Sequence, residues 1–335
     1  MCRNLVRSVV TRFSGGFVLA FHEIPPQRLA ELVDCLRPAQ VVPLSEIVRR
    51  SKDRKSTSGV FAITIDDGVG ENVKALAQLF LARQWPATFY LPTHYLDTGT
   101  AMLFQWWQRL KPFLPRRKLQ LRSCVVDFSR PGAVEQFSKK MEQLWYTQHI
   151  DAYYSITMDL LDVVVREGVV GRAALQPPAP ISWPEVSQLS KSDLLSFESH
   201  GVSHVAMSSL TERELVFEMH HSRNVVERHT GRPCRHLAYP FGGPESIGSL
   251  ALATAERYYD SATTMTLGHV DQANPWLLPR IPLYPKNSKL FAWLKILLKC
   301  NSVIHQQVDR PAHEPKEAPA SIPERRPAGA FLRTD

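Results

Sequence analysis

The stretch FAITIDDGVGENVKAL, residues 61–76, carries the strongest indication of the fold of this chain. Five residues suited to a buried strand lead directly into two adjacent aspartates and a glycine, and an amphipathic helical pattern follows, with apolar residues on one face from Val73 to Phe80. Asp66 and Asp67 repel each other, and burying both without compensation would cost several kcal/mol. The stretch therefore predicts a strand and then a helix, with a carboxylate pair between them that needs a compensating partner.

Strand and helix signals of the same kind alternate in two zones, residues 16–98 and residues 183–285. The first zone reads GFVLAF, PQRLAELVDCL, FAITI, ENVKALAQLFLARQ and ATFYL, and the second reads LLSFES, TERELVFEMHHSRNVVERHTG, RHLAYPFGG, PESIGSLALATAERYY and SATTM. The first helix of the second zone is expected to begin at a capping box of Thr211 and Glu214 and to end at Gly231. Strands that alternate with helices at this spacing predict an α/β fold with a parallel sheet.

The other segments complete the expected domain organisation. Residues 99–182 are rich in Trp, Gln and charge and end in the turn-forming QPPAPISWP, so they are expected to form a mainly helical insertion within a domain of residues 16–288. Residues 1–15 are expected to form an N-terminal arm, and residues 289–307 a basic amphipathic helix that contains KLFAWLKILLKC. Residues 308–335 are rich in Pro, Ala and charge, which predicts a disordered tail.

Composition limits the class of protein. A chain of 335 residues with 44% hydrophobic residues can bury a large core, in one large α/β domain or two smaller ones. Uncharged apolar runs long enough to span a membrane are absent from the sequence, and arginines at positions 3, 7 and 12 interrupt the apolar residues of the N-terminus, so we expect a cytoplasmic protein. The five cysteines are scattered, which indicates reduced thiols and excludes a thiolate metal site.

The net charge of +8 gathers in two clusters, at residues 49–55 and 109–122. Such clusters are typical of a solvated face, and they would also favour an anionic polymer or an anionic membrane surface. Nucleic acid is not an expected partner, because the sequence has neither a recognition-helix signature nor a basic strand studded with aromatic residues.

A second stretch, FESHGVSHVAMSSL at residues 197–210, also runs from a strand into a loop, and it places His200 and His204 four residues apart. Two imidazoles at this spacing can face one point, and an aspartate of the 66–67 pair could complete a metal site with an open position. A histidine pair alone is more often a surface or core feature. Both stretches, however, lie at the carboxyl ends of strands of a parallel sheet, where such folds carry their catalytic loops.

These motifs resemble those of the polysaccharide deacetylases, the carbohydrate esterases of family four. TIDDG resembles their T-F-D-D-G motif, HGVSH their H-S/T-x-x-H metal motif, and AYPFGG the Y-P-Y-G variant of their third motif. LAFHEIPP is similar to the Tyr-His segment that opens the poly-N-acetylglucosamine branch of the family. The resemblance covers roughly residues 16–285 apart from the insertion, and it implies a distorted (β/α) barrel with fewer than eight strands.

The resemblance also implies roles for individual residues. Asp67, His200 and His204 would bind a divalent metal, with Zn²⁺ the first expectation and Fe, Co or Ni compatible with the same ligands. Asp66 would be the base that activates water for attack on an acetamide carbonyl, and the backbone N–H of Phe241 would stabilise the charge that develops on the carbonyl oxygen.

Two further roles follow with alternatives. His22, in the early Tyr-His-like segment, would donate a proton to the leaving amine, although a histidine at a strand end can also simply bond a neighbouring backbone group; the competing acid is His269 in TLGHVD. The arginine that precedes the third motif in the family aligns with Ala238, and Arg280 in LLPRIPL is a candidate to reach the site instead. The residues expected to bind substrate are Tyr239, Arg280, Trp106 and Trp107, with Trp183 as a further candidate for stacking.

The expected function is that of a metal-dependent hydrolase that removes N-acetyl groups from a sugar of a poly- or oligosaccharide, in exopolysaccharide or cell-envelope glycan biosynthesis. The insertion is expected to cap the substrate groove. Two alternatives remain. A deacetylase or deformylase of a lipid-linked sugar would use the same residues, and the helix at 289–300 suits an anionic membrane surface. A noncatalytic carbohydrate-binding protein is less favoured, because Asp66 and both histidines are present.

Overall fold

The computed structural model describes residues 15–146, 150–271 and 273–300. These residues form two compact units: the first extends to Asp97 and resumes at Pro180, and the second runs from Thr98 to Ala179. Most of the expected N-terminal arm, the last residues of the expected basic helix and the whole expected tail lie outside the described residues. In the described part of the chain, every helix is too short or too polar to cross a lipid bilayer.

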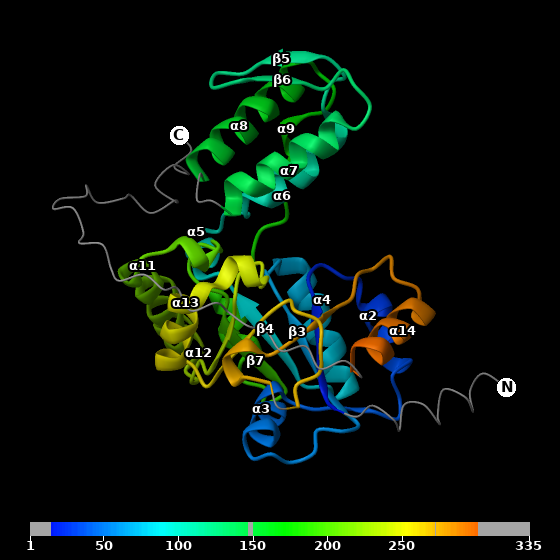
Figure 1. The fold of residues 1–335 in the computed structure, drawn as a ribbon. Coiled ribbons are helices and arrows are strands. Elements are labelled where there is room, and N and C mark those ends of the chain that lie inside the picture. The colour runs from blue at the N-terminus through cyan, green and yellow to red at the C-terminus, as the bar shows by residue number, and fades with distance from the viewer. Residues whose placement is uncertain (1–14, 147–149, 272, 301–335) are drawn as a thin grey trace. The chain divides into compact units, whose positions relative to one another are not determined.

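The first unit is built on a curled parallel sheet (Figure 1). The order of its strands is β10 (Ile281–Pro282), β1 (Phe17–Phe21), β3 (Val60–Ile65), β4 (Ala87–Leu91), β7 (Leu195–Ser199), β8 (His236–Ala238) and β9 (Ser261–Thr263). The short strand β2 (Gln40–Val41) pairs with β3 and lies off this path. Strands predicted from GFVLAF, FAITI, ATFYL, LLSFES, RHLAYPFGG and SATTM are all confirmed.

One short segment joins the two edges of the sheet. Leu278 forms a parallel bridge to Thr263 at the end of β9, and three residues later Ile281 of β10 pairs in register with Leu19 of β1. The path around the sheet therefore contains seven strands and returns to its start. This confirms the predicted distorted (β/α) barrel with fewer than eight strands.

Alternation along each strand divides the barrel into an outer and an inner face. Outward side chains such as Phe61, Ile63 and Ile65 of β3 belong to the large core that the strands share with the helices. Inward side chains such as Ala62 and Tyr90 belong to a smaller cluster inside the barrel. Because both faces are buried, these strands read as continuous apolar runs, and polar residues become noticeable only where the strands end.

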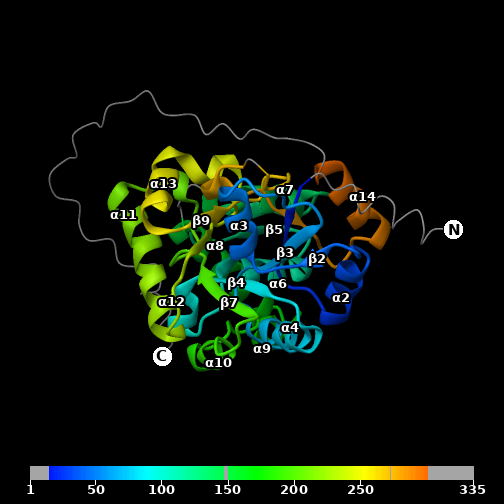
Figure 2. The ribbon, with the colours of Figure 1, turned by 90° about the horizontal axis from the view of Figure 1, so that it is seen from below.

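Helices cover the outside of the sheet in the first unit (Figure 2). They are α2 (Pro26–Asp34), α3 (Leu44–Lys52), α4 (Gly70–Arg83), α5 (Thr93–Thr98), α10 (Trp183–Leu189), α11 (Glu212–Val216), α12 (Ser222–Thr230), α13 (Pro244–Tyr258) and α14 (Lys289–Cys300), with single 3₁₀ turns at Met207–Ser209 and Pro275–Leu277. Gly248 interrupts α13 with a left-handed backbone.

The helix expected from Thr211 to Gly231 has the predicted ends but an unexpected middle. The capping box of Thr211 and Glu214 is present, and Gly231 ends the helix in a left-handed conformation. Between α11 and α12, however, the backbone widens into a π-helical turn, η3 (Phe217–His221). Such turns often occur at functional sites, because they rotate the residues that follow and reorient side chains.

The second unit is mainly helical, as expected for the insertion. It contains α6 (Leu103–Leu110), a 3₁₀ turn at Lys111–Phe113, α7 (Ala133–Tyr146), α8 (Ile150–Arg166) and α9 (Arg172–Leu175). Its antiparallel hairpin, β5 (Lys118–Gln120) and β6 (Val125–Asp127), was not predicted. The expectation that this unit caps a substrate groove stays a prediction.

The turn after β8 depends on a glycine. Gly242 has φ of 65° and donates its N–H to Pro240, while its carbonyl accepts the N–H of Met265 at 2.8 Å. A Cβ at this position would lie 2.6 Å from the backbone nitrogen of Met265, whereas a Cβ on Gly59, which also has a positive φ, would meet nothing within 4 Å.

We expect Gly242→Ala to lower the free energy of unfolding by about 2–5 kcal/mol, the sum of left-handed strain and overpacking, and Gly59→Ala by about 1–2 kcal/mol from strain alone. Urea denaturation of both variants measures the difference. Equal losses would show that the backbone of Met265 moves aside without cost.

Candidate functional site

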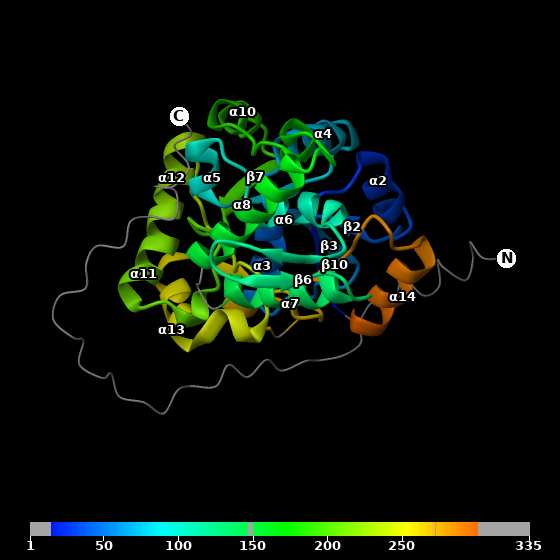
Figure 3. The same ribbon diagram turned by 90° about the horizontal axis from the view of Figure 1, so that it is seen from above.

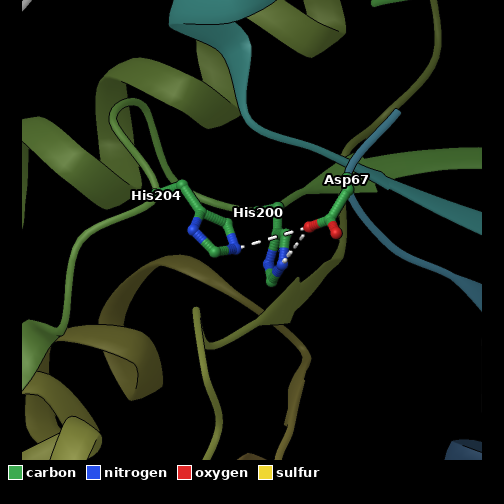
Figure 4. A group of neighbouring side chains, drawn as sticks. All are labelled: Asp67, His200 and His204. Atoms are coloured by element: carbon green, nitrogen blue, oxygen red, sulfur yellow. Dashed lines mark ion pairs between the residues drawn. The ribbon is translucent and has the colours of Figure 1, made fainter. Parts of the chain in front are cut away.

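Three of the predicted site residues gather at the carboxyl ends of the strands (Figure 4). Asp67 follows β3, and His200 and His204 follow β7. The Oδ1 atom of Asp67 lies 3.7 Å from Nε2 of His200 and 3.4 Å from Nε2 of His204. All three side chains are buried, and their nearest ligand atoms lie within 4.8 Å of one another.

This cluster fits a divalent metal. The Oδ1 atom of Asp67 is buried without a hydrogen bond, and it faces two imidazole nitrogens. Ligand atoms around a tetrahedral metal with bonds of about 2.0–2.2 Å lie about 3.3–3.6 Å apart, close to the spacings seen here. One carboxylate and two imidazoles leave a position open, which is the pattern of a catalytic centre and not of a closed structural one.

A hydrogen bond to the backbone fixes the orientation of the His200 ring. Its Nδ1 lies 2.7 Å from the carbonyl oxygen of Ala238, which can only accept a hydrogen bond, so Nδ1 carries the proton and Nε2 presents a lone pair. Burial lowers the pKa of His200 to about 4. The ring is therefore neutral at neutral pH, as a metal ligand must be.

The backbone at the site adopts conformations that are uncommon for residues with side chains. Asp67 has φ of 74°, His204 of 54° and Phe241 of 62°, and they are three of the five non-glycine residues with positive φ in the described ranges. Each such conformation costs about 1–3 kcal/mol and persists only where the surroundings hold it in place. The ring of Phe241 packs edge-on against His204, with centroids 5.1 Å apart.

Asp66, the other aspartate of the pair, faces a different partner, Arg280. Arg280 donates from Nη1 to Oδ1 of Asp66 at 2.7 Å and from Nη2 to Oδ2 at 2.8 Å. The same guanidinium donates to Oγ1 of Thr64 at 3.1 Å and to the carbonyl of Thr264 at 3.0 Å. Burial opposes ionisation of Asp66, but Arg280, followed by His200 and His22, outweighs it and holds the pKa of Asp66 below its ordinary value.

Arg280 thus reaches the site and pairs with Asp66. It is fully buried behind Asp66 and exposes no atom to a substrate. The expectation that Arg280 binds substrate is therefore corrected: the side chain orients Asp66 and keeps it ionised.

The two histidines considered as the general acid lie at opposite ends of the barrel. His22 follows β1 at its carboxyl end, with Nε2 4.0 Å from Oδ2 of Asp66, and its side chain is 39% exposed. His269 lies beside Gly15, at the amino end of β1, where the neighbouring Val270 donates its N–H to Gly16. The loop after β9 returns to that end of the barrel, so His269 lies away from Asp66, whereas His22 lies beside it, and the role of His22 as the acid stays a prediction.

The expected substrate-binding aromatics are mostly packed in cores. Tyr239 is fully buried among the side chains that face the helices, so it cannot contact a substrate. Trp183 stacks on His229 at 4.3 Å and donates to Asp97. In the second unit, Trp107 is buried against Phe137.

The tryptophan next to Trp107 differs from it in exposure. Trp106 is partly exposed, and its predicted role in sugar stacking stays a prediction.

One residue of the site was missed by the sequence reading. Glu218, in the π-helical turn η3, accepts hydrogen bonds from the backbone N–H of Val202 at 2.7 Å and of Ser203 at 3.0 Å, and from Oγ of Ser203 at 2.6 Å. These three donors lie between the two histidines, so Glu218 fixes the loop that spaces them. Its position on the helix face of Leu215 and Ser222, both buried, was the available signal.

We expect Glu218→Gln to weaken metal binding about 10- to 100-fold, because the amide replaces one acceptor oxygen with a donor and the histidine loop loses its anchor. Competition with a chelating dye measures the affinity. Glu212→Gln, on the exposed end of the same helix, is the matched control and should leave it unchanged. Unaltered affinity in Glu218→Gln would show that the loop holds its own shape.

We expect Arg280→Met to lower the free energy of unfolding by about 3–5 kcal/mol, because it leaves a buried carboxylate without a partner. Asp66→Asn combined with Arg280→Met should cost less than the two single changes added together, since neither charge is then buried alone. Urea denaturation of the four proteins completes this double-mutant cycle, and additive losses would contradict the pairing.

Comparison with known proteins agrees with this geometry. The family model described as Polysaccharide deacetylase matches residues 140–257, which include both histidines and the third motif but not the aspartate pair. A search among curated proteins finds no match.

Solved structures share the fold at low sequence identity. The Streptococcus pyogenes deacetylase PplD in complex with acetate is 13% identical, with a TM-score of 0.54 over 84% of this chain and 97% of that one. IcaB from Ammonifex degensii is 13% identical, with a TM-score of 0.53, and the match covers 86% of this chain and 98% of that one. The BpsB deacetylase domain from Bordetella bronchiseptica is 11% identical, with a TM-score of 0.52, and the match covers 82% of this chain and 97% of that one. The chain thus matches the polysaccharide deacetylase family model over residues 140–257 and shares its fold with these three deacetylase-related structures.

Proposed function

We propose that the protein is a metal-dependent hydrolase that removes N-acetyl groups from a sugar of a poly- or oligosaccharide. The observation that carries the proposal is the cluster of Asp67, His200 and His204 next to the ion-paired Asp66. A metal-binding triad beside a buried, ionised carboxylate is the combination that amide hydrolysis by activated water requires. The resemblance of LAFHEIPP to its branch of the family supports a role in exopolysaccharide or cell-envelope glycan synthesis.

Asp67, His200 and His204 would hold the metal, and we propose Zn²⁺, although Fe, Co and Ni suit the same ligands. When bound, the metal would polarise the acetamide carbonyl and lower the pKa of water at the open position. Phe241 would donate its backbone N–H to the carbonyl oxygen as negative charge develops there.

Proton transfer would be divided between two side chains. Asp66 would accept the proton of the attacking water, and its two hydrogen bonds to Arg280 keep its carboxylate from rotating away. His22 would donate a proton to the departing amine. Its position supports this role, because its side chain is partly exposed at the carboxyl end of β1 and lies 4.0 Å from Asp66.

The two aspartates provide the test of the proposal. Asp66→Asn should reduce amine release from N-acetylated oligosaccharides about 100- to 10,000-fold, the usual contribution of a positioned base, while metal content stays near that of the wild type. Asp67→Asn should lose metal first and activity as a consequence. Metal analysis and turnover on the same samples separate the two effects.

Excess Zn²⁺ is the control within this experiment. It should restore part of the activity of Asp67→Asn, which has lost a ligand, and none of that of Asp66→Asn. Equal loss of metal in both variants would contradict the division of roles. A wild type loaded with metal that releases no amine from any N-acetylated sugar would contradict the proposed function.

A further inference from the structure

Exposed apolar side chains concentrate on one surface of the first unit. Ten large hydrophobic residues in the described ranges are exposed, and half of them lie between residues 284 and 298. These five, Tyr284, Leu290, Phe291, Leu294 and Leu298, form what we call the α14 surface. Leu290 and Leu298 are the most exposed, at 67% and 66%.

The buried side of α14 holds the helix against the rest of the first unit. Ala292 and Ile296 are fully buried, and α14 packs through this side against α2 and β10. The views in Figures 2 and 3 both show α14 beside α2 at the edge of the first unit. The helix is therefore apolar on its outer side as well as its inner side, which is unusual for a helix that faces water on one side.

Positive charge surrounds the α14 surface. From Ala273 to Cys300 the sequence contains four lysines but no aspartate or glutamate, and its one arginine, Arg280, is buried against Asp66 and adds no charge to this surface. Lys286 is exposed, and Lys289 is more than half exposed. Glu31 of α2 approaches this surface, but its carboxylate pairs with Arg28 as well as with Lys289.

The basic cluster at residues 49–55 differs, because three of its five cations pair with nearby carboxylates. Arg49 and Arg50 both pair with Glu46. Lys55 pairs with Asp53. That cluster is a solvated face, whereas the α14 surface combines positive charge with exposed apolar side chains.

The α14 surface adjoins the catalytic end of the barrel. Pro282 of β10 pairs with Ala20 of β1, two residues before His22. The turn that leads into α14 is tied to the start of α2, where Arg28 donates from Nε to the carbonyl of Pro285 at 3.1 Å and from Nη2 to that of Asn287.

We propose that the α14 surface docks on an anionic lipid membrane. The apolar side chains would enter the boundary between headgroups and acyl chains, and Lys286 and Lys289 would contact lipid phosphates. A second copy of the chain is a poorer occupant, because a two-fold interface would bring the lysines of both copies together. Docking in this way holds the catalytic end near the lipid surface. If the proposed function is also correct, it favours sugars that are attached to a membrane lipid.

Vesicle binding without substrate tests the docking independently of the proposed function. The full chain is sedimented with vesicles of phosphatidylcholine and phosphatidylglycerol in equal parts, and with vesicles of phosphatidylcholine alone. The wild type should bind the anionic vesicles, and Leu290→Ser combined with Leu298→Ser should reduce the bound fraction at least about tenfold. Leu250→Ser, which changes an exposed leucine of α13, is the matched control and should bind like the wild type.

A second variant, which removes charge, tests the docking if the variant with Leu290→Ser and Leu298→Ser, the serine variant, folds poorly. Lys286→Gln combined with Lys289→Gln should weaken binding to anionic vesicles, and added salt should weaken wild-type binding in the same way. Absence of wild-type binding, equal binding to neutral vesicles, or a dimer in solution that the serine variant abolishes would each overturn the proposal. Turnover of a soluble N-acetylated oligosaccharide should be the same in the serine variant and the wild type, so failed docking is distinguishable from failed catalysis.

Discussion

The buried pair of Asp66 and Arg280 is the interaction on which the site depends. Two adjacent carboxylates at a strand end are unfavourable unless each finds its own positive or polar partner. Asp66 meets a guanidinium inside the barrel, and Asp67, on a left-handed backbone, turns toward the two histidines. The two acids can therefore differ in function although they are neighbours in sequence, because each faces a different group.

The pair also explains why the barrel closes where it does. Arg280 lies between Leu278, which bridges to β9, and Ile281, which pairs with β1. A guanidinium fully removed from water requires acceptors for its donors, and Asp66, Thr64 and Thr264 supply them from β3 and from the end of β9. The segment that completes the hydrogen bonding of the sheet is thus the segment that supplies the partner of Asp66. Closure of the sheet and the orientation of Asp66 therefore depend on the same short segment.

Much of this could be predicted from the sequence, and the failures have physical reasons. The parallel sheet, the capped helix and the gathering of Asp67 with His200 and His204 follow from local patterns, because strand ends in such a fold meet at one edge. The strand β10 was missed, since PRIPLYP contains three prolines and one of them, Pro282, is one of the two paired residues. His269 could not be separated from His22 as a candidate, because sequence spacing does not show that the loop after β9 returns to the other end of the barrel.

Alternation could have corrected another expectation: Ala238 faces the barrel interior, so Tyr239 beside it faces the helices. The left-handed backbone conformation of Phe241 and the π-helical turn that contains Glu218 have no reliable signature in the local sequence, because tertiary contacts impose both. The distance in sequence between Asp66 and Arg280, 214 positions, has a consequence for biosynthesis. On the ribosome, Asp67, His200 and His204 all emerge before Arg280, so a nascent chain has all three candidate metal ligands before it has the cationic partner of Asp66. Burial of the Asp66 carboxylate with its charge compensated must therefore wait for the C-terminal part of the barrel to be synthesised.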